Sequence, residues 1–180
     1  MVSVMHDPSH SLPPWTRGAL RIMPDVLTRI EAEAEASYPN EACGLLRGPR
    51  DVPDLLDEAL PMDNLADRYH ALDPEAFPRT ARTYFKLDEL RAARFFEEGE
   101  RIGRPVKVVY HSHCDAGAYF SEEDAATFAL DGRLAWPVAF VVLSVRAGRV
   151  ADRKLWCHVP GTGRFEEHPL VVHRGERESG

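Results

Sequence analysis

The sequence predicts an α/β (α+β) fold in which two to three helices flank one curved, mixed β-sheet. Strand-like runs outnumber helical segments in the 180 residues, and the connections between them are short. The strongest strand signal is the apolar, β-branched run PVAFVVLSV at residues 137–145. Single domains commonly hold about 100 to 200 residues, and no internal repeat is visible, so we expect one domain.

The N-terminal half predicts two elements and then a series of strands. ALRI, residues 19–22, is typical of a short strand, and Pro24 begins a helix that runs to about Ser37. The apolar face of this helix consists of Val26, Leu27, Ile30 and Ala34. Further strands are expected in the segments YPNEACGLLRGPR (38–50), LLDEALPMDN (55–64) and RTYFKLD (82–88).

The C-terminal half begins with a helix from about Asp88 to Arg101, with Leu90 and Phe95 among its buried residues. The apolar run RPVKVVYHSH, residues 104–113, follows as a buried strand. A second helix, SEEDAATFALDG, is expected to stop near Gly132. After the 137–145 strand, the segments 152–160 and 165–172 are expected to complete the sheet as a meander.

Both ends of the chain are polar and aperiodic. MVSVMHDPSHSLPPWTRG contains several prolines, so residues 1–17 are interpreted as a flexible N-terminal arm. The stretch HRGERESG, residues 173–180, is interpreted as a flexible C-terminal tail. The predicted domain therefore spans residues 18–172.

Composition excludes several classes of function. The chain is 44% hydrophobic with a net charge of −7 and has no cluster of Lys and Arg, which argues against a nucleic-acid or anionic-membrane surface. Its three cysteines match no disulfide framework and no C-x-x-C pattern. No apolar run of about 18 residues and no leader-like N-terminus is found. We therefore expect a cytoplasmic protein.

The segment YHSHCDAGAYFSEED, residues 110–124, contains the candidate metal-binding residues. His111 and His113 lie two residues apart in a predicted strand, so their side chains share a face and can converge on one metal ion. A catalytic zinc site takes three protein ligands and leaves a fourth position for water. The residues alone leave three candidates for the third ligand: Asp115, Cys114 and Asp124.

Ser121 and Asp124 also have a purely structural interpretation. S-x-x-D is a capping pattern, in which the serine accepts a hydrogen bond from the first turn of a helix and the acidic side chain reciprocates. An isolated pattern of this kind indicates only that a helix begins at Ser121. The spacing of this pattern from His111 and His113 also leaves Asp124 as a possible metal ligand.

The stretch resembles the signature of the JAMM (MPN+) metallopeptidases: H-[ST]-H, seven residues, Ser, two residues, Asp. Here His111-Ser112-His113 is followed by seven residues, then by Ser121 and by Asp124. The family also has an upstream glutamate before small and apolar residues, and NEACGLLRG supplies Glu41. The similarity runs from about residue 20 to residue 144, although residues 114 and 120 are Cys and Phe where many relatives have proline.

The resemblance implies an MPN/JAB-like (cytidine-deaminase-like) fold that binds one Zn2+ per chain. His111, His113 and Asp124 would hold the metal. Glu41 would take a proton from the zinc-bound water and later give it to the leaving amine, and Ser121 would donate to the developing oxyanion. By its position alone, Glu41 would be interpreted as a solvated charge at a turn.

The resemblance also implies a substrate class. The family cleaves peptide or isopeptide bonds after the C-terminal tail of ubiquitin or a ubiquitin-like protein, and this chain is similar to the compact bacterial type that acts with sulfur carriers. We expect hydrolysis at the Gly-Gly tail of a ubiquitin-like sulfur-carrier protein, bound in extended form beneath the loop 117–120 and against a sheet edge. The alternatives are an isopeptidase that removes a ubiquitin-like modifier from lysine, and a non-catalytic MPN binding module.

The remaining candidates are mostly structural. Cys114 is either an inert space-filler or a redox brake next to a ligand, and Cys43 is expected in the core. Tyr119 and Phe120 form either an apolar lip over the site or part of the core. The histidines without partners at ligand spacing are expected on the surface or in loops: His70, His158, His168 and His173.

Overall fold

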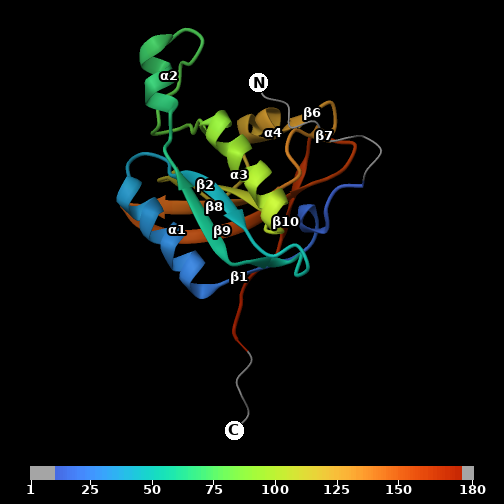
Figure 1. The fold of residues 1–180 in the computed structure, drawn as a ribbon. Helices are drawn as coiled ribbons and strands as arrows, with labels where there is room; N and C mark the ends of the chain where they lie inside the picture. Colours follow the sequence, from blue (N-terminus) through green and yellow to red (C-terminus); the bar gives the residue numbers. More distant parts are fainter. Residues whose placement is uncertain (1–10, 176–180) are drawn as a thin grey trace.

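Figure 1 shows the computed structural model, which describes residues 11–175. Its centre is a six-stranded sheet with the strand order β10-β9-β8-β5-β2-β4. These strands are β2 (Cys43–Arg47), β4 (Glu58–Met62), β5 (Val106–Cys114), β8 (Ala139–Arg146), β9 (Arg149–His158) and β10 (Phe165–His168). The β5–β8 pair is parallel and the other pairs are antiparallel, so the sheet is mixed, as predicted.

The two central strands, β5 and β8, are almost entirely buried because helices cover both faces of the sheet. Side chains alternate between the faces: Val108 and Tyr110 join one apolar cluster, and Val109 joins the other. The period of two places His111 and His113 on the same face as Val109.

Residues 11–175 contain four α-helices: α1 (Pro24–Ser37), α2 (Ala66–Leu72), α3 (Glu89–Ile102) and α4 (Glu122–Phe128). α1 covers one face, and α3 and α4 belong to the other side (Figure 1). The predicted apolar face of α1 is confirmed, since Val26, Leu27, Ile30 and Ala34 are all buried. Ala92 and Phe96 of α3 and Phe128 of α4 pack in the opposite cluster.

Two small sheets complete the fold. β11 (Leu170–Val172), β1 (Leu20–Ile22) and β3 (Leu55–Leu56) form a parallel three-stranded sheet, and β6 (Ala129–Leu130) pairs with β7 (Arg133–Leu134). The prediction that residues 165–172 continue the meander is correct only for β10. Pro169 has no N–H to offer a ladder, its carbonyl accepts from Leu20 N at 3.1 Å, and the chain changes sheet there.

The strand predicted at residues 82–88 is wrong. Phe85 and Leu87 are buried in alternation, as in a strand, but the backbone between them pairs with no neighbouring strand. Instead, Lys86 N donates to the Asn64 side chain at 3.0 Å, and Lys86 O accepts from Leu65 N at 2.9 Å. A distant asparagine thus satisfies the backbone here, which local periodicity does not reveal.

The helices differ from the prediction at three points. α2 was not expected, and it buries only Ala66, so no apolar stripe announces it. The helix expected at 88–101 is confirmed, but its buried residues are Ala92, Phe96 and Gly99. Of the two residues predicted as buried, Leu90 is 66% exposed and Phe95 is only partly buried. α4 stops at Phe128 rather than near Gly132, because Ala129 is already extended and begins β6. Asp131 and Gly132, with φ values of 50° and 74°, form the β6–β7 turn that follows.

The predicted arm and tail lie partly outside the described residues. Within the arm, Pro14–Thr16 form a 3-10 helix, and Trp15 is buried and donates to the Pro137 carbonyl at 2.8 Å. The arm prediction is therefore wrong for these residues. In the tail, His173 N donates to the Ile22 carbonyl at 2.8 Å. Among residues 11–175, no helix combines the length and the apolar character that crossing a bilayer requires.

Candidate active site

The end of β5 delivers the two histidines. β5 lies between β2 and β8, and His111 is opposite Cys43 on one side and Val142 on the other. His111 is fully buried, and His113 is 6% exposed. Between them, Ser112 points to the other face, where its hydroxyl accepts from Ala42 N at 2.8 Å. The middle residue of the H-S-H triplet thus fixes β5 to the segment that carries Glu41.

Asp124 approaches from the first turn of α4. Ser121 is the N-cap of this helix, and its Oγ accepts from Asp124 N at 3.0 Å while Asp124 Oδ2 accepts from Ser121 N at 3.0 Å. The capping box is therefore real. It also holds the Asp124 carboxylate in a fixed orientation, with the capping oxygen turned toward the end of β5.

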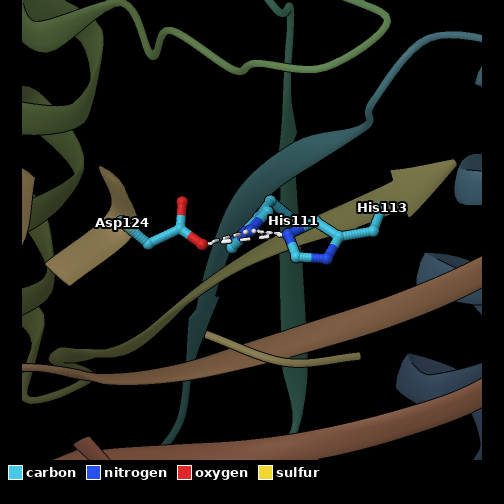
Figure 2. A group of neighbouring side chains, drawn as sticks. All are labelled: His111, His113 and Asp124. Atoms are coloured by element: carbon cyan, nitrogen blue, oxygen red, sulfur yellow. Dashed lines mark hydrogen bonds and ion pairs between the residues drawn. The ribbon is translucent and has the colours of Figure 1, made fainter. Parts of the chain in front are cut away.

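The three side chains converge on one point, as Figure 2 shows. His111 Nε2 lies 3.2 Å from His113 Nε2, and Asp124 Oδ2 lies 3.3 Å and 3.8 Å from these two nitrogens. Ligand atoms around a tetrahedral zinc, each about 2.0 Å from the metal, are separated by about 3.3 Å. The donor set and its spacing therefore fit a zinc ion.

The second ring nitrogens support this interpretation for His113. His113 Nδ1 lies 2.8 Å from the Gly117 carbonyl, which only accepts, so Nδ1 carries the proton and Nε2 keeps its lone pair in the neutral ring. His111 Nδ1 is buried without a partner among the described residues. Its ring stacks on Phe85 with centroids 4.3 Å apart, so packing rather than a hydrogen bond orients it.

Electrostatics keeps the carboxylate ionised beside the imidazoles. Burial alone would raise the pKa of Asp124, but the charge and hydrogen bond of His111, with hydrogen bonds from His113 and Ser121, hold it well below its usual range. Burial lowers the pKa of His111. Burial also opposes protonation of His113, but the interaction with Asp124, the hydrogen bond to the Gly117 carbonyl and the charge of Glu41 together outweigh it, so the pKa of His113 is raised. The ionised Asp124 carboxylate beside the two imidazoles therefore favours binding of a cation.

The loop that covers this site is fixed by its carbonyls. Ala116 O accepts from Ser144 Oγ at 2.5 Å, Gly117 O from the His113 ring, and Ala118 O from Trp156 Nε1 at 2.9 Å. Because three successive carbonyls are held by three separate strand residues, the loop positions His113 rigidly.

Asp115 and Cys114 do not join the three convergent ligands. Asp115 has a φ of 56°, and its carboxylate turns away to accept from the Tyr38 hydroxyl at 2.7 Å and from Ala147 N at 2.9 Å. Cys114 is half-buried at the end of β5. Of the three candidates for the third ligand, Asp124 alone has the required geometry.

Glu41 lies just before β2 and is 6% exposed. Its backbone is held on both sides: Glu41 N donates to the Ala81 carbonyl at 2.7 Å, and Glu41 O accepts from Asn64 Nδ2 at 3.0 Å. Burial raises the pKa of the Glu41 carboxyl to about 8, and the negative charge of Asp124 contributes in the same direction. A carboxyl so tuned can take up and release a proton near neutral pH.

One pocket brings these groups together. Glu41, His113, Ser121 and Asp124 all line it, so residues from the segment just before β2, the end of β5 and the start of α4 face the same space. Cys114 also contributes to the lining. The five residues predicted from the sequence are therefore neighbours, with fully buried His111 behind the pocket.

The remaining predictions are partly right and partly wrong. Cys43 is in the core, as expected, and Tyr119 is 52% exposed at the pocket while Phe120 packs with the core. His158 lies in β9 and is only 5% exposed, so the prediction that it lies on the surface or in a loop is wrong. Phe85 behind His111 and the pocket residues Arg79 and Arg82 were not predicted. No local motif marks them, because they come from the irregular segment before α3.

Comparison with known proteins agrees with this geometry. The family of prokaryotic homologs of the JAB domain matches residues 23–158. Curated relatives from Mycobacterium tuberculosis and Mycobacterium bovis, each called CysO-cysteine peptidase, are 33% identical over 108 residues. The match covers 58% of this chain and 62% of each relative, so this chain spans less than two thirds of the relatives' length.

Solved structures show the same fold. A protein from Desulfitobacterium hafniense superposes with a TM-score of 0.62 at 21% identity, over 86% of this chain and 92% of that protein. One from Salinibacter ruber gives 0.58 at 26% identity, over 87% and 94%. A JAB1/MPN domain protein from Archaeoglobus fulgidus gives 0.51 at 20%, over 87% and 100%. The chain belongs to the prokaryotic JAB family, a branch of the JAMM/MPN+ proteins.

Proposed function

We propose that this chain is a zinc-dependent metallopeptidase that hydrolyses a peptide bond at the C-terminal Gly-Gly tail of a ubiquitin-like sulfur-carrier protein. One observation carries the proposal. His111, His113 and Asp124 converge at zinc-ligand spacing beside a pocket that also holds a buried glutamate and a serine hydroxyl. A non-catalytic MPN binding module would not require this complete set of chemical groups.

His111, His113 and Asp124 would hold the zinc ion through two Nε2 atoms and Oδ2. A zinc ion in such a site acts as a Lewis acid and lowers the pKa of a coordinated water to near 7. The Gly117 carbonyl keeps the His113 Nε2 lone pair directed at the point where the ligand atoms converge, and the capping box keeps Asp124 Oδ2 in place. The protein thus supplies ligands that need no rearrangement.

Glu41 acts as the general base and then as the general acid. Its carboxylate takes a proton from the attacking water as the water oxygen adds to the scissile carbonyl carbon. When the C–N bond breaks, Glu41 returns this proton to the leaving nitrogen. One water is consumed, and the products are the Gly-Gly carboxylate of the carrier and a free amine.

Ser121 stabilises the carbonyl oxygen as negative charge develops on it. Its Oγ accepts from Asp124 N, which leaves the hydroxyl proton free to be donated. The serine sits at the N-terminus of α4 and lines the pocket. A donor fixed by a helix cap is pre-organised for this role.

The substrate class draws support from the relatives and from a second cleft. The name CysO-cysteine peptidase, carried by the mycobacterial proteins, supports a substrate with cysteine at the hydrolysed bond. An apolar cleft lined by Phe77, Pro78 and Ala126 shares Arg79 and Glu123 with the active-site pocket. We place the extended tail in this cleft, because the loop 116–118 is held down on the site.

A direct test compares two linkages. A Gly-Gly carrier with a short α-linked C-terminal extension, and the same carrier isopeptide-linked to lysine, are each incubated with zinc-replete protein and followed by mass spectrometry. The proposal predicts loss of the α-linked extension. Cleavage of only the isopeptide conjugate would favour an isopeptidase, and cleavage of neither would contradict the assignment for that carrier.

A further inference from the structure

Two arginines from the irregular segment before α3 line the active-site pocket. Arg79 and Arg82 are both exposed and share the pocket with Glu41 and His113. The pocket therefore combines a buried acidic interior with a basic rim. Neither arginine belongs to the group of metal ligands or to the proposed acid–base machinery.

The two arginines differ in what they already bind. Arg79 forms an ion pair with Glu123 and also lines the adjacent apolar cleft. Arg82 lines the active-site pocket, and within residues 11–175 its guanidinium has no hydrogen bond or ion pair. Arg79 is thus already neutralised, whereas the donors of the Arg82 guanidinium are available as far as residues 11–175 are concerned.

Acidic groups near Arg82 are engaged elsewhere. Asp115, whose pKa is lowered first by its bond from Ala147 N and also by the charge of Arg82, accepts from the Tyr38 hydroxyl and Ala147 N. Glu41 lies buried deeper in the pocket. An anion entering with the substrate is therefore the available partner for Arg82, and a planar guanidinium binds a carboxylate in a bidentate manner.

The chemistry of the leaving group identifies that anion. In an α-linked substrate with a single residue after the scissile bond, one carbon separates the leaving nitrogen from a free carboxylate, so this carboxylate stays within the same pocket. In an isopeptide, the leaving nitrogen ends a lysine side chain, and the lysine carbonyl lies beyond four methylenes. Only the first type of leaving group brings a carboxylate next to the reacting centre.

We propose that Arg82 binds the free α-carboxylate of a single C-terminal amino acid on the leaving side of the scissile bond. This inference rests on the proposed function and extends it: the enzyme selects a carrier that ends in one α-linked residue over amidated, longer or isopeptide-linked forms. Arg82 is a specificity determinant and takes no part in bond cleavage.

The test uses two carriers that differ only at the last group, one ending Gly-Gly-Cys with a free carboxylate and one with the same cysteine amidated. For the zinc-replete wild-type protein, we expect kcat/KM to favour the acid by roughly 10- to 100-fold, as one charge-assisted bond allows. Arg82→Gln should reduce this ratio toward one, and Arg82→Lys should retain part of it. Arg94→Gln, at an exposed position of α3 outside the pocket, should keep the wild-type ratio.

The outcomes separate the two proposals. Equal cleavage of acid and amide by the wild type would overturn the role of Arg82 and leave the peptidase function intact. A preference that persists in Arg82→Gln, with zinc content unchanged, would also overturn it. Failure of zinc-replete wild-type protein to cleave either carrier would overturn both the proposed function and this inference.

Discussion

At the scale of single residues, Asp124 has two functions that the sequence presents as alternatives. One oxygen, Oδ2, caps α4 through Ser121 N and also faces His111 Nε2 and His113 Nε2. The S-x-x-D pattern alone indicates only a helix N-terminus, and it does so correctly. The structure shows that the cap and the candidate ligand are the same carboxylate, so a local motif provides the orientation that the proposed metal site needs.

Ser121→Ala should lower kcat by a large factor but should reduce the free energy of unfolding only slightly. The variant loses a helix cap, worth about 1 kcal/mol, and the proposed oxyanion donor, worth roughly 10² to 10³-fold in kcat. The backbone bond from Ser121 N to Asp124 remains, so zinc should stay bound. Steady-state kinetics, urea unfolding and zinc content measured on the same preparation separate these effects.

Asp88→Ala is the matched control for Ser121→Ala. Asp88 caps α3 by accepting from Arg91 N at 3.0 Å, and it does not line the active-site pocket. Its loss should cost a similar free energy of unfolding without a comparable loss of kcat. If both variants lost activity in proportion to stability, Ser121 would be only a cap.

Glu41 should make the zinc-free protein sensitive to pH. Its pKa of about 8 in the folded state lies above the ordinary value of 4.5, because the carboxyl is buried. Between these values the folded state keeps a proton that the unfolded state has released, so this stabilisation is present at low pH and is lost as pH rises to about 8. Glu41→Gln lacks this titration.

The free energy of unfolding of Glu41→Gln should therefore rise relative to wild type between about pH 5 and pH 8, by up to about 1.4 kcal/mol per pH unit. His113 and Asp124 titrate in both proteins, so the difference retains only the part of their titration that depends on the charge of Glu41. Urea unfolding with a chelator present gives the measurement, and Glu97→Gln, at an exposed position of α3, gives the baseline. Parallel pH profiles for Glu41→Gln and wild type would refute the buried environment of Glu41.

At the scale of elements, the sequence predicted best where periodicity and burial agree. α1, β5 and β8 are confirmed because each buries one continuous apolar face or is covered on both sides. The strand predicted at residues 82–88 is wrong, because the Asn64 side chain, from another part of the chain, forms hydrogen bonds with the backbone there. Local pattern describes which side chains are buried there but not which groups satisfy the backbone.

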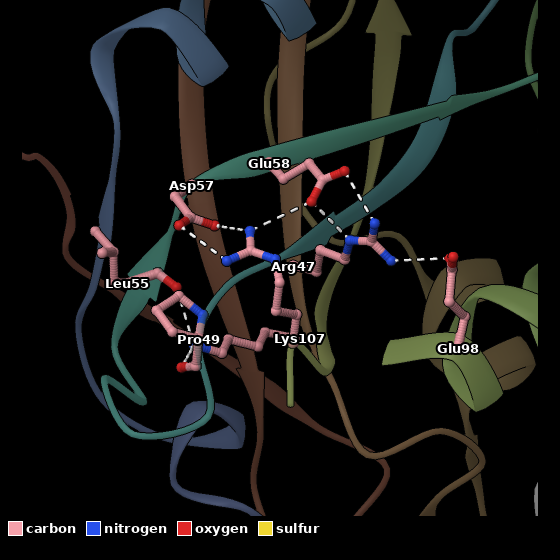
Figure 3. Close-up of polar contacts among 8 residues, drawn as sticks. Arg47, Pro49, Leu55, Asp57, Glu58, Glu98 and Lys107 are labelled. Atoms are coloured by element: carbon pink, nitrogen blue, oxygen red, sulfur yellow. Dashed lines mark hydrogen bonds and ion pairs between the residues drawn. The ribbon is translucent and has the colours of Figure 1, made fainter. Parts of the chain in front are cut away.

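A polar network holds β2, β4 and β5 at the end of the sheet remote from the histidines (Figure 3). Arg47 pairs with Glu58 at 2.8 Å and with Glu98 at 3.1 Å. Lys107, which is fully buried, donates to three carbonyls of the 49–55 loop: those of Pro49 at 2.8 Å, Val52 at 2.9 Å and Leu55 at 3.0 Å. One buried ammonium thus satisfies three backbone acceptors.

Lys107→Met should destabilise the fold by about 2 to 4 kcal/mol, because it leaves three carbonyls without their donor. Zinc content at low temperature should be unchanged, since Lys107 lies at the opposite end of β5 from His113. Lys154→Met, which removes a half-exposed lysine paired with Glu167 at 3.4 Å, should cost less than about 1 kcal/mol. Equal losses of unfolding free energy in the two variants would show that the buried hydrogen bonds of Lys107 contribute nothing specific.

At the scale of the whole molecule, three distant segments assemble the site. The segment just before β2 contributes Glu41, the end of β5 contributes His111 and His113, and α4 contributes Asp124. Spacing in the sequence could indicate the histidine pair, but Glu41 stood out only through resemblance to a family. Arg82 could not be predicted from the sequence, because the fold alone determines which irregular segment lines a pocket.

These segments are proposed to form a zinc site, and elemental analysis of purified protein measures the metal itself. We predict close to one zinc per chain in wild type and in Asp115→Ala, whose carboxylate faces Tyr38, and loss of zinc in His113→Ala and Asp124→Ala, with each variant's fold verified by circular dichroism. Full zinc occupancy in folded Asp124→Ala, with loss in Asp115→Ala, would show that Asp115 and not Asp124 is the third ligand.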